Sequence, residues 1–178
     1  MKGIRQISVG KIIKYLFSLE EELFGYRIPE EIFREGEEYH RKLGFNQPRV
    51  FGRFFKYSEK GRGREWWLVK GRPDRISVER GILYVDELKT YRNNNSKTKA
   101  LERGDTQGAI YAWLTGAEYY RVFLYDVKTQ KMERHTFRFS EKKAERSIRK
   151  GIKIGKKLER FGREPKDTEK RNLRNFSA

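Results

Sequence analysis

An acidic residue and a lysine stand two positions apart in an apolar stretch near the middle of the chain. Glu87 and Lys89 lie in ILYVDELKTY (residues 82–91), and Asp74 follows a proline in the upstream segment GRPD. Charged side chains are costly to bury, so the pair is either a surface ion pair or part of a reaction site. Two carboxylates brought together offer hard oxygen ligands suited to Mg²⁺ or Mn²⁺, and a lysine beside them can offset charge on a phosphate. Such a group is suited to metal-assisted hydrolysis of a phosphodiester bond.

For each residue taken alone, an ordinary position on the protein surface is the simpler alternative to a role in a reaction site. An exposed Glu-x-Lys triplet is common, and an aspartate after a proline is an ordinary turn residue. The combination is more informative, because alternation along a strand puts Glu87 and Lys89 on one side and Asp86 on the other. A hairpin between RISVE (residues 75–79) and the strand of Glu87 would bring Glu87 close to Asp74. A one-residue bulge would exchange Asp86 and Glu87.

The elements that must position these residues follow from hydrophobic periodicity. Helices are predicted over residues 8–24, 29–43, 106–116 and 141–161, with Ser8 as the cap of the first. Strands are predicted over residues 50–58, 64–71, 75–79, 82–91, 119–127 and 132–140, the first four forming two hairpins. The segment NNNSKTK (residues 93–99) has no apolar anchor and is interpreted as part of a mobile loop. This order indicates one α/β domain with a central sheet and helices packed on it.

Composition limits the class of partner. The chain has 178 residues, a net charge of +17 and 14% aromatic residues, which indicates one folded, strongly basic domain. Such an excess of charge favours a polyanion, most often nucleic acid, with an anionic membrane surface as the alternative. The sequence has neither a membrane-length apolar run nor a signal-peptide pattern, so we expect a soluble, cytoplasmic protein with no membrane partner. Its Lys, Arg and Glu content is also typical of thermophile proteins.

The absence of cysteine narrows the metal chemistry. It excludes disulfides, thiolate zinc sites and cysteine-ligated iron–sulfur clusters. A metal would have to be held by oxygen atoms, or by His40 or His135.

The motifs together resemble the PD-(D/E)XK nuclease superfamily. GRPD followed after a hairpin by VDELKT is similar to its defining motif. TQGAIYAW (residues 106–113) resembles the Gln-x-x-x-Tyr motif of the RecB-like branch, with Gln107 and Tyr111. GEEYHRKLG (residues 36–44) resembles the upstream helix that carries a metal-binding histidine in that branch, here His40.

The N-terminal segment ISVGKIIKYLFSLEEELFGYR (residues 7–27) is similar to the opening helix of CRISPR-associated RecB-like exonucleases. Many of those enzymes hold an iron–sulfur cluster on four cysteines, which this chain lacks. No cluster is therefore expected. The resemblance implies a restriction-endonuclease-like α/β fold, with a central mixed sheet flanked by helices.

The resemblance also implies roles for individual residues. His40, Asp74 and Glu87 would bind the Mg²⁺ or Mn²⁺ ion, with the backbone carbonyl of Leu88 as a further ligand. Lys89 would position the attacking water and stabilise developing negative charge.

Gln107 and Tyr111, which share a helix face by their spacing, would contact the DNA backbone or support the site. The segment from 141 to 178 contains 14 Lys/Arg and 6 Asp/Glu. Its helix is interpreted as a DNA-binding surface that uses Arg149, Lys153 and Lys156, with a solvated helix face as the alternative.

Residues 1–162 are expected to form a single nuclease domain, followed by a basic tail over 163–178. Aromatics beside basic residues in GRFFKY and REWWLVK could stack bases, although alternation turns most of them toward the core. The predicted function is a metal-dependent DNA nuclease, an exonuclease preferring single-stranded or end-containing DNA. A Holliday-junction-resolvase type of endonuclease and a non-catalytic nucleic-acid-binding protein are the alternatives. The sequence leaves open the cleavage polarity, the preference for DNA or RNA, and the number of metal ions. It also leaves open homo-oligomerisation and any partners in recombination, repair, CRISPR adaptation or virus replication.

Overall fold

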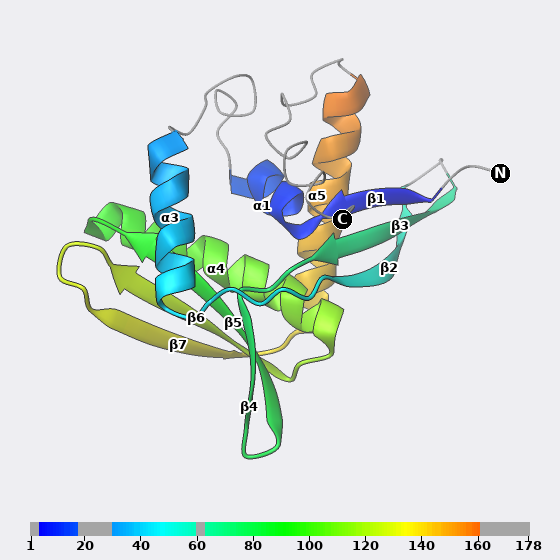
Figure 1. Cartoon of the computed structure of the whole chain (residues 1–178). Helices are drawn as coiled ribbons and strands as arrows, with labels where there is room; N and C mark the ends of the chain where they lie inside the picture. Colours follow the sequence, from blue (N-terminus) through cyan, green and yellow to red (C-terminus); the bar gives the residue numbers. More distant parts are fainter. Residues whose placement is uncertain (1–3, 18–29, 60–62, 161–178) are drawn as a thin grey trace.

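The structure is a computed structural model that describes residues 4–17, 30–59 and 63–160 (Figure 1). Its elements are, in chain order, β1 (Arg5–Ser8), α1 (Val9–Phe17), α3 (Glu30–Lys42), β2 (Phe51–Ser58), β3 (Arg64–Gly71), β4 (Arg75–Glu79), β5 (Ile82–Tyr91), α4 (Asn94–Thr115), β6 (Tyr119–Asp126), β7 (Met132–Arg138) and α5 (Glu141–Arg160). The predicted α/β class is confirmed. The basic tail over 163–178 and residues 18–24 of the first predicted helix lie outside the described residues.

The strands pair in two sheets, where the sequence predicted one central sheet. One sheet has the order β1-β3-β2, with β1 parallel and β2 antiparallel to β3. The other has the order β4-β5-β6-β7, in which β5 and β6 are parallel. The two sheets separate at Arg72-Pro73-Asp74, where the chain leaves strand geometry between β3 and β4. Proline has no N–H to donate to a ladder, so pairing cannot continue through this segment.

The β4–β5 hairpin forms where the sequence predicted it and projects from the rest of the sheet in Figure 1. Its two connecting residues, Arg80 and Gly81, have φ values of 51° and 79°. Positive φ at both turn residues matches the twist of the flanking strands, and glycine adopts it without steric cost. The turn therefore fixes the register that pairs Arg75 with Asp86.

Helix α4 corrects the prediction of a mobile loop over residues 93–99. Asn93 caps the helix: its side chain accepts a hydrogen bond from the Ser96 amide at 2.8 Å, and the Ser96 hydroxyl accepts one from the Asn93 amide at 3.1 Å. This reciprocal cap satisfies amides that have no partner within the helix. Buried Ala100 supplies the apolar anchor one turn further on, so the segment that was expected to be a mobile loop is helical.

Two glycines let α4 lie close to the sheet. A Cβ atom on Gly104 would stand 2.6 Å from Val122 Cγ1, and one on Gly108 would stand 2.6 Å from the Tyr120 ring. Their spacing of four residues turns both toward the sheet. This close approach packs the middle of α4 on β6 and brings Gly104 beside Lys89 of β5.

Helix α5 matches its predicted bounds to within one residue. Its predicted apolar side, Ala144, Ile148, Ile152 and Leu158, is buried. Strand β1 was missed, because four residues before a helix are too few to show a strand period. None of the described helices has the length and apolar character needed to cross a membrane.

Candidate active site

Strand β5 carries buried carboxylates on both of its faces. The Glu87 side chain is completely buried on the face covered by α4, and the Asp86 side chain is completely buried on the other. The ladder between β5 and β6 runs unbroken from Tyr84 to Tyr91, so no bulge exchanges the two residues. Pairing with β4 stops at Asp86, which leaves the following edge of β5 open to other groups.

Asp74 occupies that edge. Its Oδ2 atom accepts a hydrogen bond from the backbone amide of Leu88 at 2.8 Å. The amide and carbonyl of one strand residue point to the same edge, so the Leu88 carbonyl, the further ligand implied by the resemblance, lies on the Asp74 side. The break in the strands at Pro73 thus places Asp74 beside the middle of β5.

Glu87 is in an unfavourable electrostatic position. Burial, together with the neighbouring carboxylate of Asp74, raises the pKa of Glu87 to about 8 against the lowering effect of Lys89. Its Oε1 atom accepts a hydrogen bond from Lys89 Nζ at 2.5 Å, whereas its buried Oε2 atom has no hydrogen-bond partner. An orphaned oxygen of this kind is costly unless something positive binds it.

Lys89 is held by the residues of the Gln-x-x-x-Tyr motif. Its Nζ atom also donates to Gln107 Oε1 at 3.0 Å, and Gln107 Nε2 donates to the Tyr111 hydroxyl at 3.4 Å. Burial alone would lower the pKa of Lys89, but the charges of Glu87 and Asp74 raise it above its ordinary value. Tyr111 is only 5% exposed, so it does not present its ring at the surface.

Helix α3 brings His40 from the opposite side of the sheet. The ring of Tyr39 lies 5.3 Å from that of Tyr125, and this part of α3 packs on a cluster that includes Leu88. The Leu88 side chain lies on the face opposite Glu87. His40 reaches Asp74 from there, with 3.3 Å between His40 Nδ1 and Asp74 Oδ1.

Residues 14–174 match the family described as the PD-(D/E)XK nuclease superfamily. The chain belongs to this superfamily. The match covers most of the sequence and confirms the resemblance inferred from the motifs.

Several solved structures are similar to this chain. The crystal structure of SSO0001 has a TM-score of 0.59 and 21% sequence identity, covering 86% of this chain and 78% of that chain. LHK-Exo, an alkaline exonuclease from Laribacter hongkongensis, has a TM-score of 0.41 and 10% identity over 86% of this chain and 88% of its own. A phage-related exonuclease from Haemophilus somnus 129PT has a TM-score of 0.41 and 12% identity over 86% and 80% of the two chains. No curated protein matches the sequence significantly.

PD-(D/E)XK nucleases use divalent metal ions, and the site suits one chemically. Asp74 contacts His40 on one side and interacts with Glu87 on the other, so the three form a row across the strand edge. The three side chains are not preassembled as a metal-binding group. Among the described residues, no three His, Asp or Glu side chains lie close enough together to hold a metal ion. The orphaned Glu87 oxygen and a donor set of carboxylate oxygens with one imidazole nevertheless fit a divalent metal ion.

Two arginines near the PD-(D/E)XK site were missed by the sequence analysis. The charge of Arg103 acts on Lys89, and the charge of Arg72 acts on Tyr111. Arg103 stands one helical turn before Gln107 on α4, so its spacing from the Gln-x-x-x-Tyr motif could have identified it. Arg72, inside GRPD, gave no such signal because arginine is common in a basic chain.

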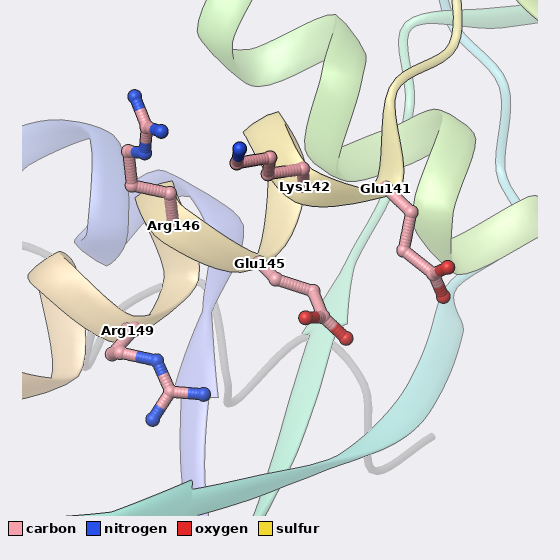
Figure 2. A pocket seen from close by; sticks show the side chains of 5 residues that line it. All are labelled: Glu141, Lys142, Glu145, Arg146 and Arg149. Atoms are coloured by element: carbon pink, nitrogen blue, oxygen red, sulfur yellow. The ribbon is translucent and has the colours of Figure 1, made fainter.

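The basic residues predicted on α5 do not join the site, and one of them is not on the surface. Arg149 and Lys153 are exposed, but Lys156 is 8% exposed and donates to Glu65 Oε1 at 2.7 Å. The predicted DNA contact at Lys156 is therefore wrong, because this position on α5 faces the β2–β3 hairpin and not the solvent. Figure 2 shows acidic side chains among the basic ones at the start of α5, where an open hollow is lined by Glu141, Lys142, Glu145, Arg146 and Arg149.

Proposed function

We propose that this protein is a metal-dependent DNA nuclease that acts as an exonuclease on single-stranded or end-containing DNA. The observation that carries the proposal is the buried Glu87 carboxylate, which stands between Asp74 and Lys89 with one oxygen unpartnered. A fold needs no such arrangement for its stability, whereas metal-assisted phosphodiester hydrolysis does.

Each side chain has a distinct part in this proposal. Asp74 and Glu87 would hold the divalent ion, with His40 and the Leu88 carbonyl completing its ligands. The ion supplies Lewis-acid activation of the phosphodiester and its nucleophile. Lys89, oriented by Gln107, stabilises negative charge that develops on the phosphate.

Charge favours DNA as the substrate. The net charge of +17 attracts a polyanion, and the exposed Arg149 and Lys153 on α5 are proposed as contacts to its backbone. The preference for strand ends is proposed from His40 and the Gln-x-x-x-Tyr helix, the two features shared with RecB-like exonucleases. Cutting of closed circular DNA would instead favour a structure-specific endonuclease.

The test compares the wild type with Asp74→Asn and Lys89→Ala on end-labelled single- and double-stranded DNA, with Mg²⁺, Mn²⁺ or EDTA. Asparagine keeps an oxygen that can accept the Leu88 amide, so Asp74→Asn removes the charge and spares the backbone contact. Lys131→Ala, at an exposed position in the loop before the edge strand β7, is the matched control. We expect metal-dependent degradation by the wild type and the control alone. Equal degradation by all four proteins would refute the proposed site.

A further inference from the structure

Among the side chains whose burial the structure describes, two aromatics are largely exposed, Phe54 on β2 and Trp66 on β3. They are 53% and 54% exposed, and every other Phe, Tyr or Trp whose burial the structure describes is buried or partly buried. Single exposed apolar residues are ordinary, but two exposed aromatics on neighbouring strands form a patch.

The register of the hairpin puts both rings on one face. Phe54 pairs with Leu68 and Lys56 pairs with Trp66, so the two aromatics are diagonal neighbours across the strands. Diagonal neighbours lie about 7–8 Å apart, within reach of each other's side chains. The intervening residues Phe55 and Trp67 are buried on the other face, in the core.

We call the side of the β1-β3-β2 sheet that carries Phe54, Lys56, Trp66, Leu68 and Lys70 the outer face. The described helices contact the other side of this sheet. Helix α5 crosses it there in Figure 1, with Lys156 bonded to the inward-facing Glu65. The outer face is thus a sheet surface with aromatic side chains and no helix of the described residues upon it.

The charged residues on the outer face are all basic. Lys56 lies with its Nζ atom 5.9 Å from the centre of the Trp66 ring, and Arg64 and Lys70 stand at alternate positions of the same strand. The outward positions of β2 and β3 contain no Asp or Glu. Aromatic rings interleaved with cations complement the bases and phosphates of a nucleic acid strand.

We propose that the outer face binds single-stranded DNA, with two bases stacked on Phe54 and Trp66 and the phosphates beside Lys56, Arg64 and Lys70. A duplex hides the faces of its bases within its own stack, so this surface selects single strands. Strand β3 runs from Trp66 to Gly71, which is three residues before Asp74. A DNA strand that follows β3 is thereby directed toward the PD-(D/E)XK site. That last step rests on the proposed nuclease function; the binding itself does not.

The test measures binding in EDTA, where cleavage cannot occur, by fluorescence anisotropy of a labelled oligothymidylate and of a blunt duplex. We expect Phe54→Ala and Trp66→Ala each to weaken single-strand binding about 5- to 100-fold, because stacking is lost, with duplex binding unchanged. Trp66→Phe should largely restore the affinity. Val78→Ala and Met132→Ala remove exposed apolar side chains from the other sheet and should change neither affinity.

A second arm measures the salt dependence of single-strand binding. Replacing both Lys56 and Lys70 with alanine should lower the slope of log affinity against log salt by about 1.4, the loss of two phosphate contacts. An unchanged single-strand affinity in the Phe54→Ala/Trp66→Ala double variant would overturn the inference. An equal loss of duplex affinity in that variant would also overturn it. A change of that variant from dimer to monomer, with its DNA affinity intact, would overturn it too, because the outer face would then be an interface between copies of this chain. Loss of metal-dependent cleavage in Asp74→Asn is read separately, so the two proposals can fail independently.

Discussion

Asp86 and Glu87 are consecutive acidic residues with completely buried side chains, and their surroundings are opposite in kind. Asp86 has a guanidinium on each side, since Arg75 is its partner on β4 and Arg121 its partner on β6. Arg121 bonds both of its oxygens, at 2.6 and 3.0 Å, and Arg75 Nε donates at 2.9 Å. Its charge is fully compensated within the sheet.

Glu87, on the other face, has one cation and one like charge. Lys89 bonds one of its oxygens, and Asp74 raises its pKa in the same direction as burial does. The difference teaches that burial of a carboxylate alone does not mark a reactive site. An arginine pair makes Asp86 structural, whereas an orphaned oxygen leaves Glu87 able to bind a further cation.

The sharpest test of this contrast is Glu87→Gln. We expect a loss of nuclease activity of about a thousandfold or more, about 4 kcal/mol, because the amide cannot hold the divalent ion. The thermal midpoint without metal should be equal to or above that of the wild type, since a buried repulsion with Asp74 disappears. Steady-state cleavage and calorimetry measure the two effects. Full activity in this variant would mean that Glu87 is only structural.

Asp86→Asn is the matched substitution on the other face. We expect it to lower the free energy of unfolding by about 3 kcal/mol or more, because Arg121, only 3% exposed, loses its buried charged partner and keeps only the exposed Glu79. Urea denaturation measures this loss, and activity per folded molecule should stay near that of the wild type. A stable but inactive Asp86→Asn protein would reverse the roles assigned to the two faces.

The proposed metal ion should bind on the Glu87 face of β5 and stabilise the folded protein. Mg²⁺ or Mn²⁺ at about a hundred times its dissociation constant should stabilise the wild type by about 2.7 kcal/mol, since only the folded site binds it. Asp74→Asn should show little of this gain, and EDTA should remove it from the wild type. Thermal denaturation with and without metal checks the result. An equal gain in Asp74→Asn would place the ion elsewhere.

The smallest effect is expected at Gln107. Gln107→Ala removes one hydrogen bond to Lys89, so we expect a fall in kcat of about tenfold, corresponding to 1–1.5 kcal/mol, with KM little changed. Gln107→Glu keeps an acceptor for the ammonium and should recover part of the rate. A rise in KM with kcat unchanged would instead assign Gln107 to direct DNA contact.

Local patterns predicted most of the fold and supplied the residues of the candidate site. The bounds of β3, β4 and β5 are as predicted, and alternation placed Asp86 opposite Glu87. The errors have local causes of their own. Residues 93–99 lack apolar periodicity and form a helix through the Asn93 cap, which a purely hydrophobic pattern does not register.

Long-range placement explains the other differences. Lys156 has the same residue type and helix as exposed Lys153, and only the position of the β2–β3 hairpin buries it beside Glu65. The exposure of Phe54 and Trp66 likewise depends on which face of that hairpin the helices cover. Neither fact is encoded in the spacing of neighbouring residues.

By itself the sequence determined the chemical types at the site and the side of β5 on which each stands, because the two-residue period of a strand is a local property. The tertiary structure decided what each carboxylate meets. Strand neighbours bring arginines to Asp86, and the break at Pro73 brings Asp74 to the edge beside Glu87. His40 arrives from the far face on α3. The predicted hairpin already brought Asp74 close to Glu87. The meetings of Arg121 with Asp86 and of His40 with Asp74 join residues far apart in the chain, and packing selects them, so periodicity cannot foresee them.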